Sequence, residues 1–546
     1  MKPKYLAFPL LAVVLSPTVM AGQFIWTGST NSTWTTAANW DITSSVPASP
    51  DTYPIPGSTY ASDFLNIRNN GDLLTSLSGV TPGADAVYNP GSGVTTTFNN
   101  GRCFVIGTGA GPTATLPNLP NRKGYAKLIV SSGTIVGARS SNTGSEAYMA
   151  NRADSTLLIN GGSVDLSQQL NNFRLIQEGF ADVNGAITST ITIDSGSLSC
   201  RSLDLVYDTE SDPATVFGNG VVNLNGGTLT TLRFVRSAAS DPGQTTFTLN
   251  LNGGTLRPLV SLTSPAILLD ALTDLTTVVK AGGAIINTTS PAAPTTAINS
   301  TIAEVLEHDP ALGATLDGGL TKNGVGTLTL SGANTFTGPV TVNAGTLTTT
   351  SRLLLANNSA AGSGEITLAG AYTDIQVNNT RNIPNPITIS DAGDQKTLLL
   401  PAPTPAAFAA ATFSGPITIN ETSIDQFRVR ADTDGFLTLS GKISGPGGVY
   451  KFQNGTVTLS NATNDFTGGA KITQGGLSFS NGALGTGGSI LMDGGTLTWS
   501  AGNSQDISSR LVMVTGKTAT LNLAEQTTPS YAISNVTFAG AIGSGT

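Results

Sequence analysis

Charge is scarce in this chain: Asp, Glu, Lys and Arg make up 11% of its 546 residues, where about 25% is typical. The formal net charge is -8, and no extended basic patch is visible. This balance argues against nucleic-acid binding, because that binding depends on Lys and Arg neutralising phosphates. Apolar residues still make up 39% of the chain, so the low charge does not indicate disorder.

Histidine and cysteine are nearly missing as well. The chain has one histidine, His308, and two cysteines, Cys103 and Cys200. Neither a C-x-x-C pattern nor a second histidine is present, which makes a zinc site improbable. A Ser-His-Asp triad would have to use His308, in LEHDPALG, and we predict that residue to lie in a loop. We expect no cofactor.

Long hydrophobic runs are missing except at the N-terminus. Lys2 and Lys4 precede the apolar stretch 6–15, and Val19 and Ala21 occupy the small-residue positions of a signal-peptidase site. We therefore predict that residues 1–21 are a signal peptide and that the mature chain begins at Gly22. No later run approaches the length of a transmembrane helix, so we expect an exported chain without a transmembrane segment.

What the sequence does contain is a repeated phrase: a short alternating strand, a polar residue with Gly, and a second short strand. Gly at such a corner permits a sharp turn or a positive φ. The copies are KLIVSSGTI (127–135), LLINGGSV (157–164), ITIDSGSL (191–198), VNLNGGTL (222–229), LNLNGGTL (249–256), VTVNAGTL (340–347), KITQGGL (471–477) and ILMDGGTL (490–497).

The spacing of these corners distinguishes between β architectures. The corner glycines recur every 20 to 30 residues or so, which is the period of a solenoid coil that must stack on its neighbours. A β-propeller needs roughly 40 residues or more per blade. A sandwich, or a string of sandwiches, is the structural alternative, because Asn-Gly also suits tight hairpins. We predict an all-β, elongated solenoid of roughly 20 coils and on the order of 100 Å.

In the solenoid, alternation predicts which residues of LTLSGANTFTGPVTVNAGTL (328–347) face the core. Leu, Val and Phe should point into the core, and Thr and Ser should face outward. Asn334 and Asn343 should stack in ladders with equivalent residues of neighbouring coils. Gly345 and Gly495 should occupy corners that resist a Cβ atom.

The segment GGLTKNGVGTLTLSGANTFTGPVTVNAGTL (318–347) resembles the autotransporter-associated β-strand repeat, also called the passenger-associated transport repeat. A looser copy spans 447–477, with one residue inserted before Phe466 and VYKFQ in place of LTKNG. The segment 24–41 is similar to the WTG…W…ANW opening of such exported proteins. The resemblance implies a right-handed parallel β-helix and a role of the repeat in passenger folding and transport to the cell surface.

We expect residues 22–124 to form a capping region and first irregular coils, 125–300 further irregular coils, and 301–546 the coils that carry the repeats. Pro-rich loops or insertions should interrupt them at 46–57, 107–124, 288–299 and 399–416. Trp26, Trp34 and Trp40 should cover the first coil, with a sugar-stacking platform as the alternative.

Two further expectations depend on the coil count. Cys103 and Cys200 should lie three to five coils apart, beyond the reach of a disulfide, and should be free and buried. Residues 538–546 parallel 439–447, where a full repeat follows, so we expect the polypeptide to continue past Thr546 with more repeats and an anchor.

Acidic residues gather most closely in VYDTESDP. Asp208, Glu210 and Asp212 are a candidate calcium site, with a solvated loop as the plainer interpretation. Asp432 and Asp434 in ADTDGF are a second candidate, without the remaining ligands of an EF-hand loop. A β-helix lyase or hydrolase acting on acidic glycans would need carboxylates gathered on one sheet face.

Together these features predict a secreted or cell-surface passenger, a structural and adhesive rod without enzymatic activity. Its expected partners are surface or matrix glycans or proteins, and an outer-membrane translocator that exports it. The alternative is the polysaccharide lyase or hydrolase on the same fold.

Overall fold

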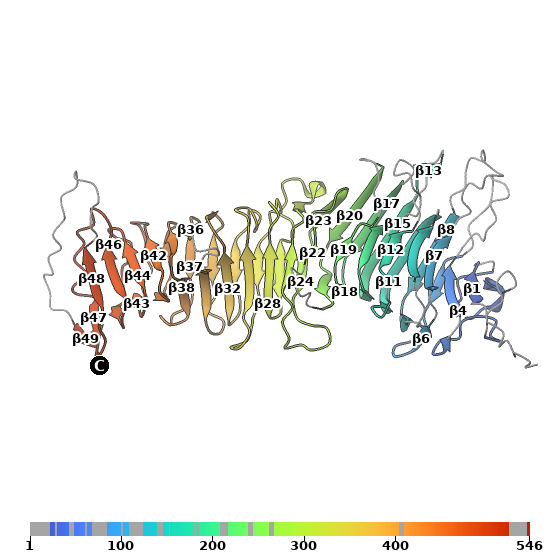
Figure 1. The fold of residues 1–546 in the computed structure, drawn as a ribbon, viewed down its shortest axis with the longest axis horizontal. Helices are drawn as coiled ribbons and strands as arrows, with labels where there is room; N and C mark the ends of the chain where they lie inside the picture. Colours follow the sequence, from blue (N-terminus) through green and yellow to red (C-terminus); the bar gives the residue numbers. More distant parts are fainter. Residues whose placement is uncertain are drawn as a thin grey trace, which may run out of the picture.

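The computed structural model shows a straight rod built from parallel strands, with β1 at one end and β48 and β49 at the other (Figure 1). The fold is therefore the predicted all-β parallel β-helix, and the β-sandwich alternative is wrong. The residues that the structure describes are 22–27, 30–42, 49–60, 63–67, 84–99, 102–108, 124–138, 146–151, 153–169, 171–177, 181–182, 185–207, 217–237, 244–260, 267–402, 409–523 and 543–545.

Each full coil has three sides, and the strands of one side stack along the rod into a ladder. The first face consists of β5 (Ala86–Tyr88), β8 (Gly124–Val130), the first halves of β11 (Ala153–Leu166) and β15 (Thr188–Cys200), β17 (Gly218–Leu224), β20 (Thr245–Leu251), β23 (Leu275–Val279) and β26 (Leu306–His308). After irregular turns at 334–336 and 358–363 it resumes as β33 (Arg381–Ile383), β36 (Ala409–Phe413), β39 (Gly435–Leu439), β42 (Thr456–Leu459), β44 (Gly476–Phe479), β46 (Thr496–Trp499) and β48 (Thr520–Leu523).

The second face runs through most of the rod. It consists of β3 (Thr59–Tyr60), β6 (Thr95–Phe98), β9 (Thr134–Gly137), the second halves of β11 and β15, β18 (Thr228–Thr231), β21 (Thr255–Pro258), β24 (Ala284–Asn287), β27 (Leu320–Asn323), β29 (Val340–Val342), β31 (Ile366–Leu368), β34 (Ile387–Ile389), β37 (Ile417–Ile419) and β40 (Ile443–Ser444). The long strands β11 and β15 bend around a corner, where their mutual register shifts, and so join the first two faces.

The third face begins with β1 (Gly22–Trp26), β4 (Asp63–Ile67), β7 (Arg102–Thr108), β10 (Glu146–Asn151), β12 (Phe173–Ile176), β16 (Leu203–Val206) and β19 (Phe234–Val235). It continues as β22 (Ile267–Leu269), β25 (Ser300–Ile302), β28 (Gly326–Leu330), β30 (Ser351–Leu355), β32 (Thr373–Val377), β35 (Lys396–Leu400), β38 (Phe427–Ala431), β41 (Val449–Phe452), β43 (Ala470–Ile472), β45 (Ile490–Met492), β47 (Leu511–Val514) and β49 (Gly543–Gly545). Nineteen stacked strands at about 4.8 Å correspond to a rod of roughly 90 Å, which agrees with the predicted coil number.

The remaining elements are short. The strand β2 (Trp40–Asp41) pairs antiparallel with β1, and β13 (Ala181–Asp182) pairs antiparallel with β14 (Gly185–Ala186). Among the described residues, the 3-10 helices η1 (Ala37–Asn39) and η3 (Pro310–Leu312) lie in connections. The Pro-rich segment 288–299 is an insertion between β24 and β25, as predicted.

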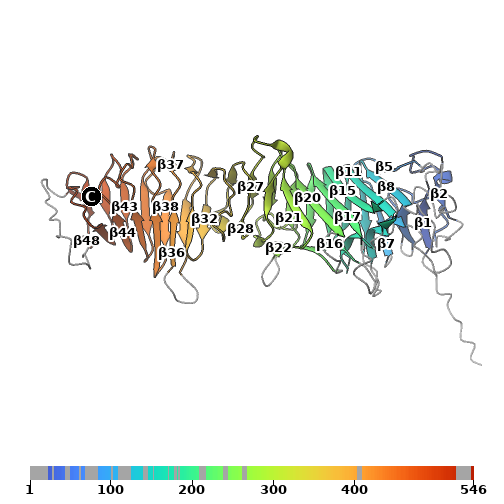
Figure 2. The same ribbon diagram turned by 90° about the horizontal axis from the view of Figure 1, so that it is seen from above.

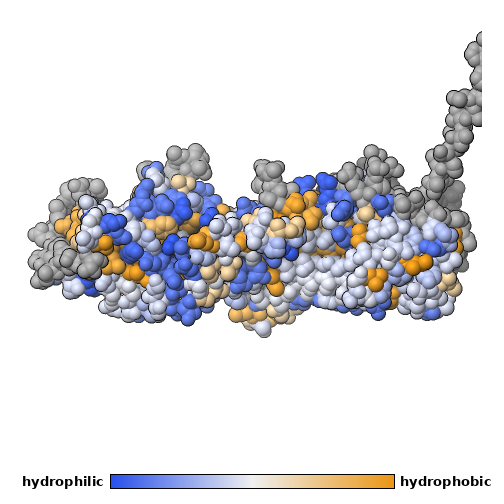
Figure 3. Space-filling view, turned by 90° about the horizontal axis from the view of Figure 1, so that it is seen from below, coloured by the Kyte–Doolittle hydropathy of each residue, from blue (hydrophilic) through white to orange (hydrophobic). Residues whose placement is uncertain are grey.

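One continuous apolar core fills the rod from Phe24 to Leu511. Burial alternates along the strands, as the sequence pattern requires: in β28 the leucines are buried and the threonines between them are half-buried. The view turned by 90° shows the same narrow rod (Figure 2). On the face seen from below, hydrophilic residues are interspersed with small separate hydrophobic patches (Figure 3).

The corners are as tightly packed as the sequence predicts. A Cβ atom added to Gly345 would lie 2.3 Å from the backbone nitrogen of Ser351. Gly495 has a φ of +64°, and a Cβ there would lie 2.9 Å from the carbonyl oxygen of Gly475. Contacts below about 3 Å with backbone atoms force a shift of the chain, so these corners select glycine.

Polar ladders also follow the prediction in part. The side chain of Asn343 donates to Oδ1 of Asn323 in the preceding coil at 2.7 Å. Asn250 and Asn223 form an equivalent step at 2.8 Å. Asn334 does not join such a ladder; the prediction for this residue is wrong, because its side chain is buried and bonds to the backbone.

Three tryptophans cover the first coil, as predicted. Trp26, Trp34 and Trp40 are 0%, 4% and 6% exposed, and their rings contact one another, with Trp34 and Trp40 at 4.9 Å between centroids. Asn39, fully buried beside them, accepts from the backbone nitrogens of Thr30 and Asn31 at 2.9 and 3.0 Å. A sugar-stacking platform of these three rings is not supported, because their faces are packed in the core.

Cys200, at the end of β15, is a free thiol with no exposed surface, which confirms the prediction for this residue. Cys103 lies in β7, and β16, the strand that follows Cys200, is the third strand along from β7 in the same ladder. The side chain of Cys103 is outside the described residues. The predicted absence of a bridge between the two cysteines stays a prediction.

Candidate functional site

The residues predicted as a calcium site, Asp208, Glu210 and Asp212, lie outside the described residues, as does the predicted signal peptide. Both predictions stay predictions. Within the described part of the chain, no group of three or more His, Cys, Asp or Glu side chains could hold a metal ion. The second candidate fails, because the Asp432 carboxylate is engaged by the Arg430 guanidinium at 2.7 and 2.9 Å.

His308 is not a loop residue as predicted but the last residue of strand β26. Its Nδ1 lies 2.7 Å from Oδ2 of Asp317, and its Nε2 lies 3.1 Å from the carbonyl of Gly313. The bond to Asp317 raises the pKa of His308. Since both ring nitrogens face acceptors, the arrangement suits an imidazolium that donates from both sides.

Asp317 ties this corner to the next coil. Its carboxylate accepts from the backbone nitrogens of Thr337, Gly338 and Gly319 at 2.7 to 2.9 Å. Burial opposes the charge, but the hydrogen bonds from Thr337, His308 and the glycine backbones prevail, and the pKa of Asp317 is lowered. A histidine held in this way cannot act as a general base, because neither nitrogen has a free lone pair. The cluster is structural.

Each of the two repeat segments contains a fully buried lysine. Lys322 in β27 and Lys451 in β41 have no exposed surface. The ammonium of Lys322 donates to the carbonyls of Asn323 and Gly324, and to the hydroxyls of Thr288 and Ser351. None of these four partners is a carboxylate.

Lys451 repeats this geometry. Its Nζ donates to the carbonyls of the next two residues, Phe452 and Gln453, at 2.9 and 2.5 Å, and to the carbonyl of Gln474 in the following coil at 3.1 Å. Both lysines therefore bind carbonyls at the corner that directly follows their own strand. We call this arrangement the lysine cap.

Burial strongly disfavours the charged form of both caps. It lowers the pKa of Lys322 to about 7 and the pKa of Lys451 to about 8. Lys396 in β35 is also buried, but its Nζ lies 3.5 Å from Oε2 of Glu421. Burial lowers the pKa of Lys396, and the Glu421 carboxylate opposes this shift. The two caps of the repeats thus differ from an ordinary buried ion pair.

A second fixed contact follows each lysine cap. Oδ1 of Asn334 accepts from the backbone nitrogen of Leu306 in the preceding coil at 2.9 Å, and its Nδ2 donates to the carbonyl of Ala360 in the next coil at 2.6 Å. Asn464 makes the same pair of bonds, to Ile443 at 2.8 Å and Ala483 at 2.8 Å. Each asparagine therefore connects three successive coils, and we call it the asparagine staple.

Phe336 and Phe466, two residues after each staple, have no exposed surface and fill the core beside the staple. The residue inserted in the second copy lies between cap and staple, and it leaves both contacts intact. The replacement of LTKNG by VYKFQ therefore changes the repeat little, because the lysine is retained at the equivalent position.

The two copies do not use the same faces of the rod. The first lysine cap lies on the second face, in β27, whereas the second lies on the third face, in β41. The staples are displaced by one face in the same direction. Cap and staple therefore belong to the local repeat and not to a fixed side of the rod.

Two comparisons with known proteins return no match: neither the curated proteins nor the solved structures contain one. A third comparison, with family models, matches the passenger-associated transport repeat at residues 320–348 and 450–479. These are the two segments that carry the lysine caps and asparagine staples. The chain thus contains the repeat of autotransporter passengers, as the sequence predicts, and this repeat is typical of structural, exported proteins. The comparison gives no support to the polysaccharide lyase alternative.

Among the described residues, the structure has no helix of the length and apolarity that crossing a membrane requires.

Proposed function

We propose that this chain is the exported, non-enzymatic passenger of an autotransporter-like protein, and that it displays a long surface for contact with glycans or proteins. An outer-membrane translocator is its partner in export. The outer faces of the rod, rich in Thr, Ser and Asn, support a contact role more than a reaction. Asp208, Glu210 and Asp212 remain a proposed weak calcium site within this rod.

We further propose that the two repeats assist folding of the rod during transport. The observation that carries this proposal is the occurrence of cap and staple in both matched segments, on different faces. A parallel β-helix depends on contacts between coils that are distant in sequence, and such contacts form slowly. A cap that closes its own corner, followed by a staple to both neighbouring coils, lets structure spread from coil to coil.

The experiment compares export of the complete gene product in the producing cells for three forms of the chain. The wild type is compared with the double variant Asn334→Ala, Asn464→Ala and with the control Asn343→Ala, which removes a partly exposed ladder step. Folded, protease-resistant chain outside the cells should fall several-fold in the double variant and stay near wild type in the control. Equal export of the double variant and the wild type would contradict a role of the repeats in folding during transport.

The same variants can be tested with purified residues 22–546. After dilution from urea, the double variant should regain its β circular-dichroism signal more slowly than the control. Loss of stability without slower refolding would count against the proposal, because the staples would then stabilise the folded rod without accelerating its folding.

A further inference from the structure

A pocket with a volume of about 380 Å³ opens at the end of the rod where the chain begins. It lies between the loop 32–35, the loop around Pro56 and the end of β5. A parallel β-bridge between Thr33 and Val87 fixes the first loop onto β5. Its volume is within the range of about 300 to 1,000 Å³ found for small-molecule sites.

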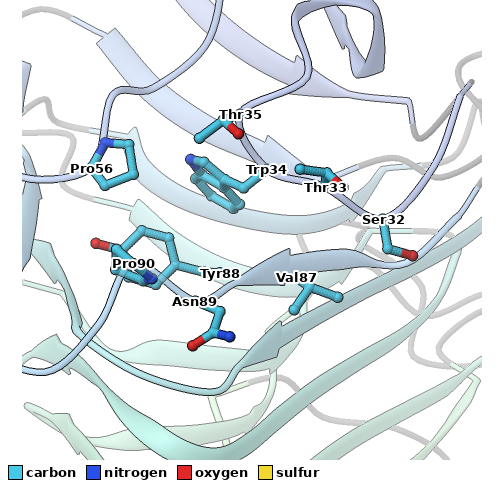
Figure 4. A pocket seen from close by; sticks show the side chains of 9 residues that line it. All are labelled: Ser32, Thr33, Trp34, Thr35, Pro56, Val87, Tyr88, Asn89 and Pro90. Atoms are coloured by element: carbon cyan, nitrogen blue, oxygen red, sulfur yellow. The ribbon is translucent and has the colours of Figure 1, made fainter.

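The inner part of the pocket is apolar. Trp34 and Tyr88 lie at its base with ring centroids 5.0 Å apart, and Pro56 and Pro90 flank them (Figure 4). Both aromatic rings are held in place: Nε1 of Trp34 donates to the carbonyl of Pro54 at 2.7 Å, and the Tyr88 hydroxyl lies 2.8 Å from Oγ1 of Thr96. The base of the pocket is therefore preformed, and ligand binding need not order these rings.

The rim of the pocket carries neutral polar groups. Ser32, Thr33 and Thr35 contribute hydroxyls, and Asn89 contributes an amide. The Asn89 oxygen accepts from Oγ of Ser132 at 2.7 Å, and this bond holds the amide at the rim. Thr33, Thr35 and Asn89 are exposed, so the rim is open to solvent.

None of the nine lining residues is Asp, Glu, Lys, Arg or His. An anionic or cationic ligand would find no opposite charge there, and its desolvation would not be compensated. A neutral saccharide unit has the complementary composition: an apolar C–H face that can lie on the half-buried Pro56, Val87 and Pro90 side chains, and hydroxyls that can bond to the polar rim.

We propose that this pocket binds one neutral hexose unit of a glycan. The proposal deepens the proposed function, on which it rests, by placing a glycan contact at one end of the rod. It is independent of the tryptophan platform considered from the sequence, because Trp34 offers only the small part of its ring that lines the pocket.

The experiment is a saturation-transfer NMR titration of purified residues 22–546 with three probes: cellobiose, lactose and a trigalacturonate. At least one neutral disaccharide should bind with a dissociation constant in the millimolar range, and the trigalacturonate should bind at least fivefold more weakly. Two variants test the location. Asn89→Ala removes the rim amide and Val87→Trp fills the pocket, and each should weaken binding at least fivefold.

The matched control is Asn454→Ala, an exposed asparagine in the second repeat, which should bind like the wild type. Circular dichroism shows whether each variant is folded. Lack of binding of both neutral probes, unchanged binding in both pocket variants, or preferred binding of trigalacturonate would overturn the proposal. These results do not depend on export, so failure of the pocket and failure of the passenger role are distinguishable.

Discussion

The lysine cap of the first repeat makes stability depend on pH in a defined direction. Lys322 has a pKa of about 7 in the folded chain and an ordinary value near 10.4 when unfolded. Between these values the unfolded chain binds more protons, so raising the pH stabilises the folded state. Below pH 7 both states are protonated, and the full cost of burying the charge is present.

The magnitude follows from the two pKa values. Integration from pH 7 to pH 9 gives a gain of about 2 kcal/mol in the free energy of unfolding from Lys322 alone. Other groups also titrate in this range, so the quantity to measure is the difference between the wild type and Lys322→Met. This variant keeps a long, unbranched side chain but has no titrating amine. Loss of the hydrogen bonds to the two carbonyls and the two hydroxyls is present at every pH and shifts the difference by a constant.

The assay is urea denaturation followed by circular dichroism at pH 7, 8 and 9. The stability of the wild type relative to Lys322→Met should rise by about 2 kcal/mol over this range. The control Lys442→Met removes a lysine whose side chain is 45% exposed and pairs with Asp465, and its difference from wild type should stay constant. A constant difference for Lys322→Met as well would refute the burial argument for the cap.

Four further predictions concern other parts of the rod. Asn334→Ala leaves the backbone groups of Leu306 and Ala360 unpaired and should cost about 2–4 kcal/mol, against about 0.5–1.5 for Asn343→Ala; equal denaturation midpoints would contradict the staple. Gly495→Val should cost about 1–3 kcal/mol, and the outward Thr498→Ser almost nothing; similar costs would show that the corner is misassigned. Wild type should be more stable than His308→Gln at a pH below the ordinary histidine pKa of about 6.5, and this difference should be lost as the pH rises through the raised pKa of His308. Urea midpoints from pH 5 to 9 that show no such loss would refute the assignment of His308 as an imidazolium. Non-reducing mass analysis should find Cys103 and Cys200 unbridged, and native Cys200 should resist thiol reagents, because burial raises its pKa to about 12; a bridge would contradict the stacking order of the coils.

The sequence predicts the architecture well because two periodic signals agree. Alternation assigns the leucines of β28 to the core, and the recurrence of corner glycines near every 20 residues matches the register in which Val449, Ala470 and Ile490 lie above one another. Both signals are local, and a solenoid is built from local units. The burial of the three tryptophans follows from the need to cover an exposed first coil.

The polar interior was predictable only in part. Lys322 follows Leu320 by two residues, so the alternation of the strand places it on the buried side. Lysine side chains are rarely buried without a carboxylate partner, however, so its residue type argues for exposure. Its burial depends on carbonyls that only the folded corner brings together. The ladder prediction for Asn334 followed from its place in the repeat, and it failed because its actual partners, Leu306 and Ala360, lie 28 and 26 positions away. Such pairings are fixed by stacking and cannot be read from one repeat.

The displacement of the second repeat by one face had no signal in the sequence, since it depends on the lengths of all intervening coils. The partner of His308 was likewise hidden. Asp317 lies nine residues away, beyond the helical turn η3, and only the corner after β26 brings the two side chains together.

The central claim is that this chain is exported as a β-helical passenger, and the most direct measurement is the accessibility of the chain on intact producing cells. Antibodies raised against purified residues 22–546 should label unbroken cells or detect the chain in the medium, and N-terminal analysis of that material should begin at Gly22. A chain that is found only after the cells are lysed, with Met1 to Ala21 still attached, would contradict the account.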